Sequence, residues 1–223
     1  MNNKYQQLMQ LPLFQGISAD KITALVEKLP FHFLKFHNGE QIFAAGTPCT
    51  HIKFIVSGKV RIETAFPGLR VALMQTVSTP HVLAPEYLFG RETTYPYTAV
   101  AEGQCGILQL RKSDYIKMLG IDKVFLFNIL NYLSSGSQRA TKSALSIKDG
   151  SVAERLSLLV DNLTLAGATD ISLHFKQKDL CSLLGTQRTT LIATLSKLME
   201  HGVITFDSNL MQIINPAGLA ELA

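Results

Sequence analysis

Residues 175–204 read FKQKDLCSLLGTQRTTLIATLSKLMEHGVI, a stretch that predicts two short helices broken by a glycine. The first helix is expected from Lys176 to Leu184, and Gly185 supplies the tight turn. The second helix is expected from Gln187 to His201, and Gly202 ends it. Leucines three or four residues apart give the pair an apolar face. These leucines are Leu180, Leu183, Leu184, Leu191, Leu195 and Leu198.

The second helix opens with polar and β-branched side chains that do little to favour a helix. After it, residues 203–215 (VITFDSNLMQIIN) predict two strands around a turn, a hairpin. Helix, glycine turn, helix and hairpin in this order are typical of a winged helix-turn-helix, whose second helix enters the DNA major groove. Side chains at its start need hydrogen-bonding tips that reach base edges. The candidate DNA-reading residues are Gln187, Arg188, Thr189 and Thr190.

Charge supports this reading only locally. The whole chain has a net charge of +4, yet residues 151–223 hold five lysines and arginines against seven aspartates and glutamates, a net of −2. Residues 176–197 hold four basic residues against one acid, a net of +3. Lys176, Lys178 and Lys197 are therefore the candidates for binding phosphates. The alternative is an ordinary helical hairpin with a solvated polar face.

The region before this motif predicts β-structure. Residues 39–110 contain short alternating runs separated by turn residues, such as HIKFIVSG and CGILQLR. Several strands at this spacing indicate a β-roll, that is, a double-sheet jelly roll. A helix capped by Ser18 is expected to precede it.

Residues 122–147 predict one long helix with an apolar seam whose second half contains small residues, which allow close helix approach. The seam favours a two-helix dimer interface, and the alternative is a helix lying on its own β domain. Its residues are Leu126, Ile129, Leu133, Gly136, Ala140, Ala144 and Ile147. Asp149-Gly150 is a turn signal, and Ser151 with Glu154 forms a capping box for the next helix.

The predicted fold class is therefore α+β, in three parts. A β-roll sensor domain spans residues 1–121, a dimerisation helix with a hinge spans 122–150, and a winged helix-turn-helix domain spans 151–223. The three cysteines stand far apart without a C-x-x-C pair, which gives poor support to a zinc site or an iron–sulfur cluster. We expect a cytoplasmic protein, because no signal peptide and no membrane-spanning run is present.

Two stretches carry a resemblance to a known family. NGEQIFAAGTPCTHIKFIVSGKVRIET (38–64) resembles the opening of the β-roll of the Crp/Fnr family of bacterial transcription regulators, and DLCSLLGTQRTTLIATLSKLMEHGVI (179–204) resembles its DNA-reading motif. The order of roll, long helix and winged domain also matches. The resemblance implies a homodimer that binds an inverted-repeat operator on double-stranded DNA, with RNA polymerase as a further candidate partner and a small-molecule effector in the roll. It does not indicate the operator sequence, the target genes, or whether the effect is activation or repression.

The sequence departs from the cyclic-nucleotide members of that family. Tyr95 and Pro96 stand where those members carry the Arg-Ser pair that binds phosphate, and Arg91 lies nearby at the wrong spacing. Because a phosphate diester needs a guanidinium or an equivalent donor, we expect an effector other than cyclic AMP. The candidate pocket residues are Glu86, Arg91, Tyr95, Tyr97 and Thr141.

Three alternatives remain open. A haem-based sensor would use axial ligands from among His32, His37, His51 and His81. A cupin-like metal enzyme would use histidines with Glu86, but the His-x-His pair and other catalytic motifs are absent, so we predict no enzyme and no metal site. A regulator with a degenerate helix-turn-helix would bind only protein and show no salt-dependent DNA binding.

Overall fold

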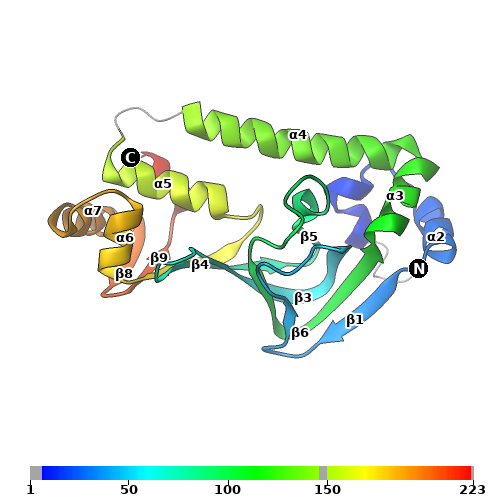
Figure 1. The fold of residues 1–223 in the computed structure, drawn as a ribbon, viewed down its shortest axis with the longest axis horizontal. Coiled ribbons are helices and arrows are strands. Elements are labelled where there is room, and N and C mark those ends of the chain that lie inside the picture. The colour runs from blue at the N-terminus through cyan, green and yellow to red at the C-terminus, as the bar shows by residue number, and fades with distance from the viewer. Residues whose placement is uncertain (1–6, 146–149, 222–223) are drawn as a thin grey trace. The chain divides into compact units, whose positions relative to one another are not determined.

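The computed structural model describes residues 7–145 and 150–221, and its chain divides into two compact units (Figure 1). The first unit comprises residues 1–61 and 77–138, and the second comprises residues 62–76 and 139–223. The predicted division into three parts was linear in sequence. The observed units are not linear, because the tip of one β-hairpin, residues 62–76, groups with the C-terminal residues.

The first unit is built on antiparallel strands, and β6 pairs with both β1 and β2, while β5 pairs with β3. The strand order is β1-β6-β3-β4, and β3 and β4 continue as the hairpin into the second unit. This arrangement confirms the predicted jelly-roll-like architecture. The elements in chain order are η1 (Pro12–Phe14), α2 (Ala19–Lys28), β1 (His32–Phe36), β2 (Gln41–Phe43), β3 (His51–Ala65), β4 (Val71–Ser78), β5 (His81–Leu83), η2 (Pro85–Tyr87), β6 (Thr98–Arg111) and α3 (Lys112–Ile121).

The Ser-Gly pair in β3 has a steric reason. Gly58 has a φ of +82°, and a Cβ atom added there would lie 2.2 Å from the carbonyl oxygen of Gln104 on β6. Any other residue would clash with that backbone, so only glycine allows the two strands to approach at this point. The buried side chains around it, Phe54, Ile55 and Ile107, form part of the core of the first unit.

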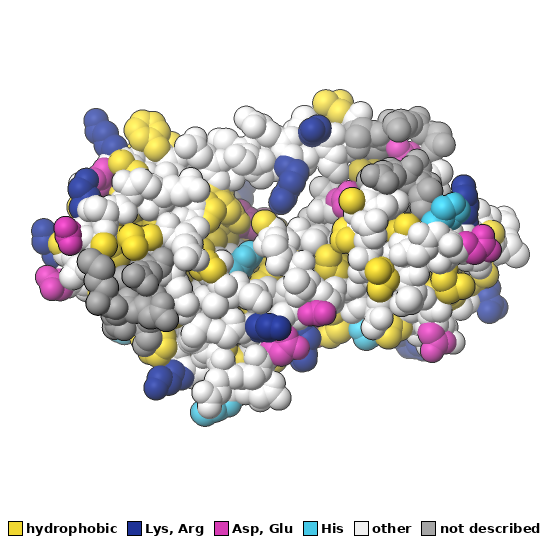
Figure 2. Space-filling model, turned by 180° about the vertical axis from the view of Figure 1, so that it is seen from behind, with side chains coloured by type: hydrophobic (Ala, Val, Ile, Leu, Met, Phe, Trp, Pro, Cys, Tyr) yellow, Lys and Arg dark blue, Asp and Glu magenta, His cyan; other side chains and the backbone are white. Residues whose placement is uncertain are grey.

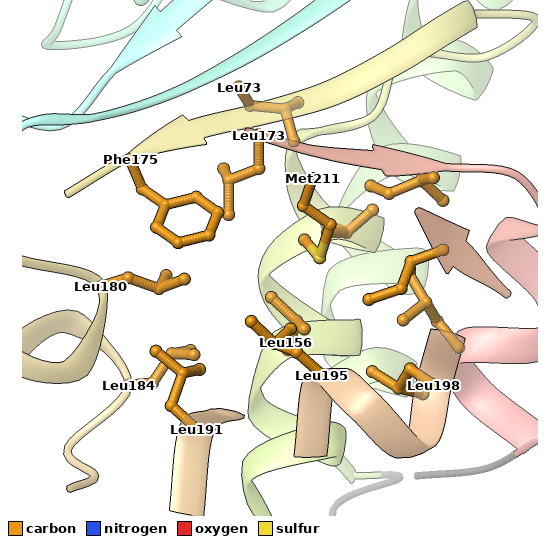
Figure 3. Close-up of a cluster of buried hydrophobic side chains, with 14 of the residues drawn as sticks. Leu73, Leu156, Leu173, Phe175, Leu180, Leu184, Leu191, Leu195, Leu198 and Met211 are labelled. Atoms are coloured by element: carbon orange, nitrogen blue, oxygen red, sulfur yellow. The ribbon is translucent and has the colours of Figure 1, made fainter. Parts of the chain in front are cut away.

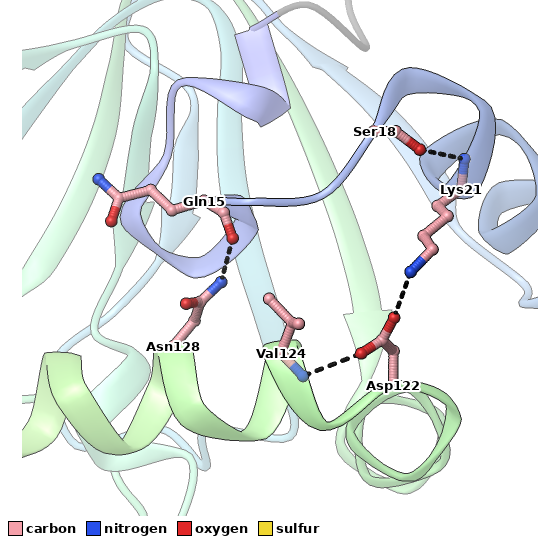
Figure 4. A network of polar contacts seen from close by, with 6 residues as sticks. All are labelled: Gln15, Ser18, Lys21, Asp122, Val124 and Asn128. Carbon is pink, nitrogen blue, oxygen red and sulfur yellow. Dashed lines mark hydrogen bonds and ion pairs between the residues drawn. The ribbon is translucent and has the colours of Figure 1, made fainter.

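The helix α4 (Lys123–Leu145) begins in contact with the first unit (Figure 4). The Asn128 side-chain amide donates hydrogen bonds to the carbonyl oxygens of Leu13 and Gln15, at 3.2 and 2.9 Å. At the start of the helix, Asp122 accepts a hydrogen bond from the backbone N–H of Val124 and forms a 2.8 Å ion pair with Lys21. The start of α4 therefore lies on its own β domain, as the second interpretation of this helix expected.

The predicted seam of α4 needs a correction at one position. Ile129 is 3% exposed because it packs into its own chain, so it cannot lie on a free surface, whereas Leu126 is 40% and Leu130 48% exposed. The positions 126, 130, 133, 137, 140 and 144 share one face, with the alternating spacing of four and three that a coiled coil requires. Gly136, Ala140 and Ala144 are exposed, and Ile147 lies outside the described residues.

The second unit combines the hairpin tip with the C-terminal residues. The strand β4 pairs with β7, which pairs with β9, which pairs with β8. Leucines from β4, α5, β7, α6 and α7 meet in one buried cluster (Figure 3). The elements are α5 (Val152–Leu163), β7 (Thr169–Phe175), α6 (Gln177–Leu183), α7 (Arg188–Glu200), β8 (Ile204–Asp207), β9 (Leu210–Ile213) and α8 (Pro216–Glu221).

The predicted capping box of α5 is confirmed. The Ser151 hydroxyl accepts a hydrogen bond from the N–H of Glu154 at 3.1 Å, and the Glu154 carboxylate accepts one from the N–H of Gly150 at 2.7 Å. Both bonds satisfy N–H groups that have no partner within the helix. Within the two described ranges of the chain, none of the helices combines the length and the apolar character needed to cross a membrane.

Candidate nucleic-acid interface

The turn between α6 and α7 is formed as the sequence predicts. Gly185 has a φ of +57°, a conformation that favours glycine, and its N–H donates to the carbonyl oxygen of Ser182. The N–H of Thr186 donates to the carbonyl oxygen of Cys181 at 2.9 Å, which ends α6. The inward leucines of both helices are buried, as Figure 3 shows, and they hold α7 in place: Leu180, Leu184, Leu191, Leu195 and Leu198.

The four candidate reading residues lie together at the start of α7. Gln187, Arg188, Thr189 and Thr190 are all exposed. Gln187 is the N-cap residue, but its side chain makes no capping hydrogen bond. Within the described residues, none of the four side chains has a hydrogen-bond or ion-pair partner. Their polar atoms are therefore available to an external molecule and contribute nothing to the local fold.

Basic side chains flank these tips. Lys176, Lys178 and Lys197 are exposed, and no ion pair joins them to a carboxylate among residues 7–145 and 150–221. The nearby acid, Asp179, accepts a hydrogen bond from the backbone N–H of Arg70 at 3.0 Å. Charges of both signs are interspersed on the face shown in Figure 2. The positive character of the site is thus local, as the sequence indicated.

A hollow beside the turn adds residues that sequence reasoning missed. It is lined by side chains of α6, the turn and the start of α7: Lys178, Cys181, Ser182, Thr186, Gln187 and Thr190. Ser182 and Thr186 bring hydroxyl groups to the same surface as Lys178. Their signal in the sequence was their position on either side of the glycine turn, which places them beside the start of the second helix.

The roll places two predicted pocket residues in its interior. Tyr95 is 4% exposed, its ring stacks on Phe43 with the ring centres 3.7 Å apart, and its hydroxyl donates to the carbonyl oxygen of His51. Tyr97 is also buried, and its hydroxyl makes no hydrogen bond of ordinary geometry with a described residue. Burial raises the pKa of both phenols above the ordinary value of 10.0. At the position of the phosphate-binding arginine, this chain therefore has a packed aromatic ring.

The other predicted pocket residues lie in different surroundings. Glu86 and Arg91 are exposed in the first unit, and Thr141 is exposed on the part of α4 that belongs to the second unit. Cys49, which sequence reasoning did not select, is buried next to Tyr95, and burial raises the pKa of its thiol. No pattern around Cys49 in the sequence marked it as a neighbour of Tyr95.

The histidines of the roll do not gather at one point. His81 lies on β5, where burial lowers its pKa to about 4, and the Nδ1 atom of His51 is hydrogen-bonded to the Thr50 hydroxyl. The part of the chain that the structure describes contains no group of three or more histidine, cysteine or acidic side chains placed to hold a metal ion.

Two family models match the chain, one in each half. A model described as a cyclic nucleotide-binding domain matches residues 33–122, and one described as a Crp-like helix-turn-helix domain matches residues 151–222. The first match covers the antiparallel roll, and the second covers α5 to α8 with the exposed start of α7. The matched ranges thus agree with the two structural layers derived above.

Similar proteins extend over nearly the whole chain. The cyclic AMP receptor protein of Thermus thermophilus is 24% identical over 217 residues, which cover 95% of this chain and 96% of that protein. The global nitrogen regulator of Synechococcus elongatus is 24% identical over 207 residues, covering 87% of this chain and 90% of that protein. The solved structure of the Thermus thermophilus catabolite activator protein has the same fold, with a TM-score of 0.54 and 21% identity, covering 96% of this chain and 98% of that one.

Proposed function

The chain belongs to the Crp/Fnr family of transcription regulators, and from this premise we propose that it is a homodimer that reads an inverted-repeat operator under the control of an effector other than cyclic AMP. Regulators of this family are not enzymes, and their helix-turn-helix domain binds DNA. We expect the protein to act in the bacterial cytoplasm, with RNA polymerase as a further partner at its promoters.

The observation that carries the DNA-reading proposal is the start of α7. Four exposed side chains stand there without an intramolecular partner, on a helix whose other face is held by buried leucines. Arg188 suits a bidentate hydrogen bond to a guanine edge, and the threonine methyl groups suit contact with thymine. Lys176, Lys178 and Lys197 suit phosphates, which fix the orientation of the domain but do not select a sequence.

The test of DNA binding is a mobility-shift titration on a selected operator and on scrambled DNA at two salt concentrations. We expect tighter binding to the operator and a loss of affinity for both DNAs as the salt concentration rises. Salt-independent binding, or no binding to either DNA, would instead support the degenerate motif that contacts only protein.

The corrected seam of α4 supports the dimer. Leu126 and Leu130 are exposed and Leu133 is half-buried on the face that continues through Ser137, Ala140 and Ala144. Burying each of these leucines against a second copy would contribute about 1.5–3 kcal/mol. In a dimer, the two α7 helices would meet half-sites about one DNA turn apart, that is, ~34 Å.

The double variant Leu126→Glu with Leu130→Glu is therefore expected to be a monomer by light scattering. The matched control is Ile129→Ala on the buried face of the same helix. It should lower the free energy of unfolding by about 2–5 kcal/mol and leave the protein dimeric. A monomeric unmodified protein would contradict the proposal.

The surroundings of Tyr95 support an effector other than cyclic AMP. A phosphate needs a charge-assisted donor, whereas Tyr95 directs its hydroxyl to a backbone carbonyl and Pro96 has no N–H. Relatives also differ in what their names describe, since one is a cyclic AMP receptor protein and another a nitrogen regulator. We expect calorimetry with cyclic AMP and with cyclic GMP to show no heat of binding, and micromolar binding of either would overturn this proposal.

Haem remains the alternative effector. A haem-bound form would show a Soret absorbance band in the purified protein, and substitution of its axial histidine would remove the band. The absence of this band after reconstitution with haem would leave a small organic effector as the proposal.

A further inference from the structure

The tip of the β3–β4 hairpin, residues 62–76, is built into the second unit. Its strand β4 pairs with β7 in antiparallel register, with Val71 opposite Phe175 and Leu73 opposite Leu173. Val71 is 2% exposed and Leu73 is fully buried, and both belong to the same core cluster as the leucines of α6 and α7 (Figure 3). The tip is therefore held to the winged helix-turn-helix by a strand ladder and by a shared core.

The turn of this hairpin ends at Arg70, whose backbone is anchored on both sides. The Arg70 carbonyl oxygen accepts a hydrogen bond from the N–H of Lys176 at 2.9 Å, and its N–H donates to the Asp179 carboxylate at 3.0 Å. The Arg70 side chain is exposed, and within the described residues it has no hydrogen-bond or ion-pair partner. Its guanidinium is thus carried by a fixed backbone directly beside the start of α6.

A hollow opens at this corner, and its polar lining is basic. Arg70 from the hairpin, His174 and Lys176 from the end of β7, and Asn209 from the turn between β8 and β9 line it. None of the described residues lining the hollow is acidic. Two cations, an imidazole and an amide without a carboxylate favour an anionic occupant, and a guanidinium is suited to binding phosphate through two parallel hydrogen bonds.

We propose that Arg70 binds a phosphate of the DNA backbone beside the one bound by Lys176, so that the hairpin tip forms a third part of the DNA interface. This inference rests on the proposed DNA binding. DNA is the occupant because the hollow continues the surface that already carries Lys176 and because it includes the turn of the wing. A phosphate contact holds the domain on DNA of any sequence, so Arg70 contributes affinity and no base preference.

The test compares the full-length protein with Arg70→Ala and Arg70→Lys in the titration on operator and scrambled DNA at about 50 and about 200 mM salt. Arg70→Ala should weaken binding to both DNAs by the same factor. Each lost phosphate contact lowers the salt slope by about 0.9, so the variant should lose about threefold less affinity per lost contact between the two salt concentrations. Arg70→Lys keeps the charge and should keep most of the slope.

The matched control is Arg61→Ala. Arg61 is an exposed arginine on the same hairpin strand, β3, but it does not line the hollow, so its loss should leave the salt slope unchanged. Phosphate ethylation interference supplies a second measurement. Ethylation at one position per half-site should block the unmodified protein but not Arg70→Ala, a result that a folding defect could not produce.

The outcomes separate the two proposals. If the unmodified protein shows no salt-dependent binding to either DNA, the proposed function fails and takes this inference with it. If the unmodified protein binds while Arg70→Ala behaves as Arg61→Ala does, or if Arg70→Ala loses affinity only for the operator, the phosphate contact is wrong and the proposed function stands.

Discussion

The start of α7 and the surroundings of Tyr95 are both sites where the sequence departs from the simplest pattern, but the structure treats them in opposite ways. At α7, four polar side chains are exposed and lack intramolecular partners. At Tyr95, the ring is buried, stacks on Phe43 and donates to a backbone carbonyl. One site directs its chemistry outward, and the other uses it in the core.

This difference separates what can be inferred about the two binding functions. Free side chains on a rigid helix point to an external partner, and their types indicate which base edges and phosphates they suit. A packed tyrosine indicates only that a cationic phosphate site is missing, because its own contacts already account for it. The DNA partner therefore follows from residues that are present, whereas the effector is limited only by residues that are absent from their expected positions.

The largest expected effect tests whether Tyr95 belongs to the core. Tyr95→Ala should lower the free energy of unfolding of the first unit by about 3–5 kcal/mol, because it removes a buried aromatic ring and leaves a cavity. Hydrogen exchange of the β6 amides measures this change. The control Tyr95→Phe keeps the stacked ring and should cost only about 0.5–1.5 kcal/mol. An unchanged stability of Tyr95→Ala would mean that the ring covers an open ligand site.

The next effect tests the outward site. Arg188→Ala should weaken operator binding by roughly 1–3 kcal/mol and relax the preference at one base pair per half-site. Its unfolding free energy should stay within about 0.5 kcal/mol of that of the unmodified protein, because the side chain has no partner to lose. The matched control Lys197→Ala should weaken operator and scrambled DNA equally. An equal loss on both DNAs for Arg188→Ala would leave the residue with a phosphate contact only.

The third effect uses alkaline pH, which acts on one site and not on the other. Burial raises the pKa of Tyr95 and Tyr97 above 10.0, so the folded state holds these protons more tightly than the unfolded state. This stability is complete below pH 10 and is lost as the pH rises above it, at about 1.4 kcal/mol per pH unit for each tyrosine. Denaturant titrations from pH 9 to pH 11 check it. Tyr97→Phe should show a shallower loss, and an unchanged slope would contradict its burial.

The smallest effect exchanges function for stability at the start of α7. Gln187 occupies the N-cap position without capping the helix, so Gln187→Ser should stabilise the second unit by about 1 kcal/mol. The same change shortens a side chain that is expected to reach DNA, so operator affinity should fall. Thermal unfolding and the mobility-shift titration measure the two effects on one sample. If the variant bound the operator more tightly, Gln187 would have no role in reading DNA.

Much of this protein could be predicted from sequence because the patterns involved are local. The glycine turn at Gly185, the leucine spacing of α6 and α7, and the capping box of Ser151 and Glu154 depend on residues within a few positions of one another. The order of roll, long helix and winged domain followed from such signals. The exposed residues at the start of α7 could be selected for the same reason, since the period of a helix also determines which side chains face away from its core.

Only the tertiary structure decided three other features, because each depends on residues far apart in the chain. Both candidate stripes of α4 are apolar, and contact with the first unit buries Ile129 and leaves Leu130 exposed. The hairpin tip, residues 62–76, joins the second unit through strand pairing with β7, about a hundred positions later. Tyr95 fills the interior of the roll because Phe43, on another strand, stacks against it. Long-range packing selects among faces and partners that local patterns leave equivalent.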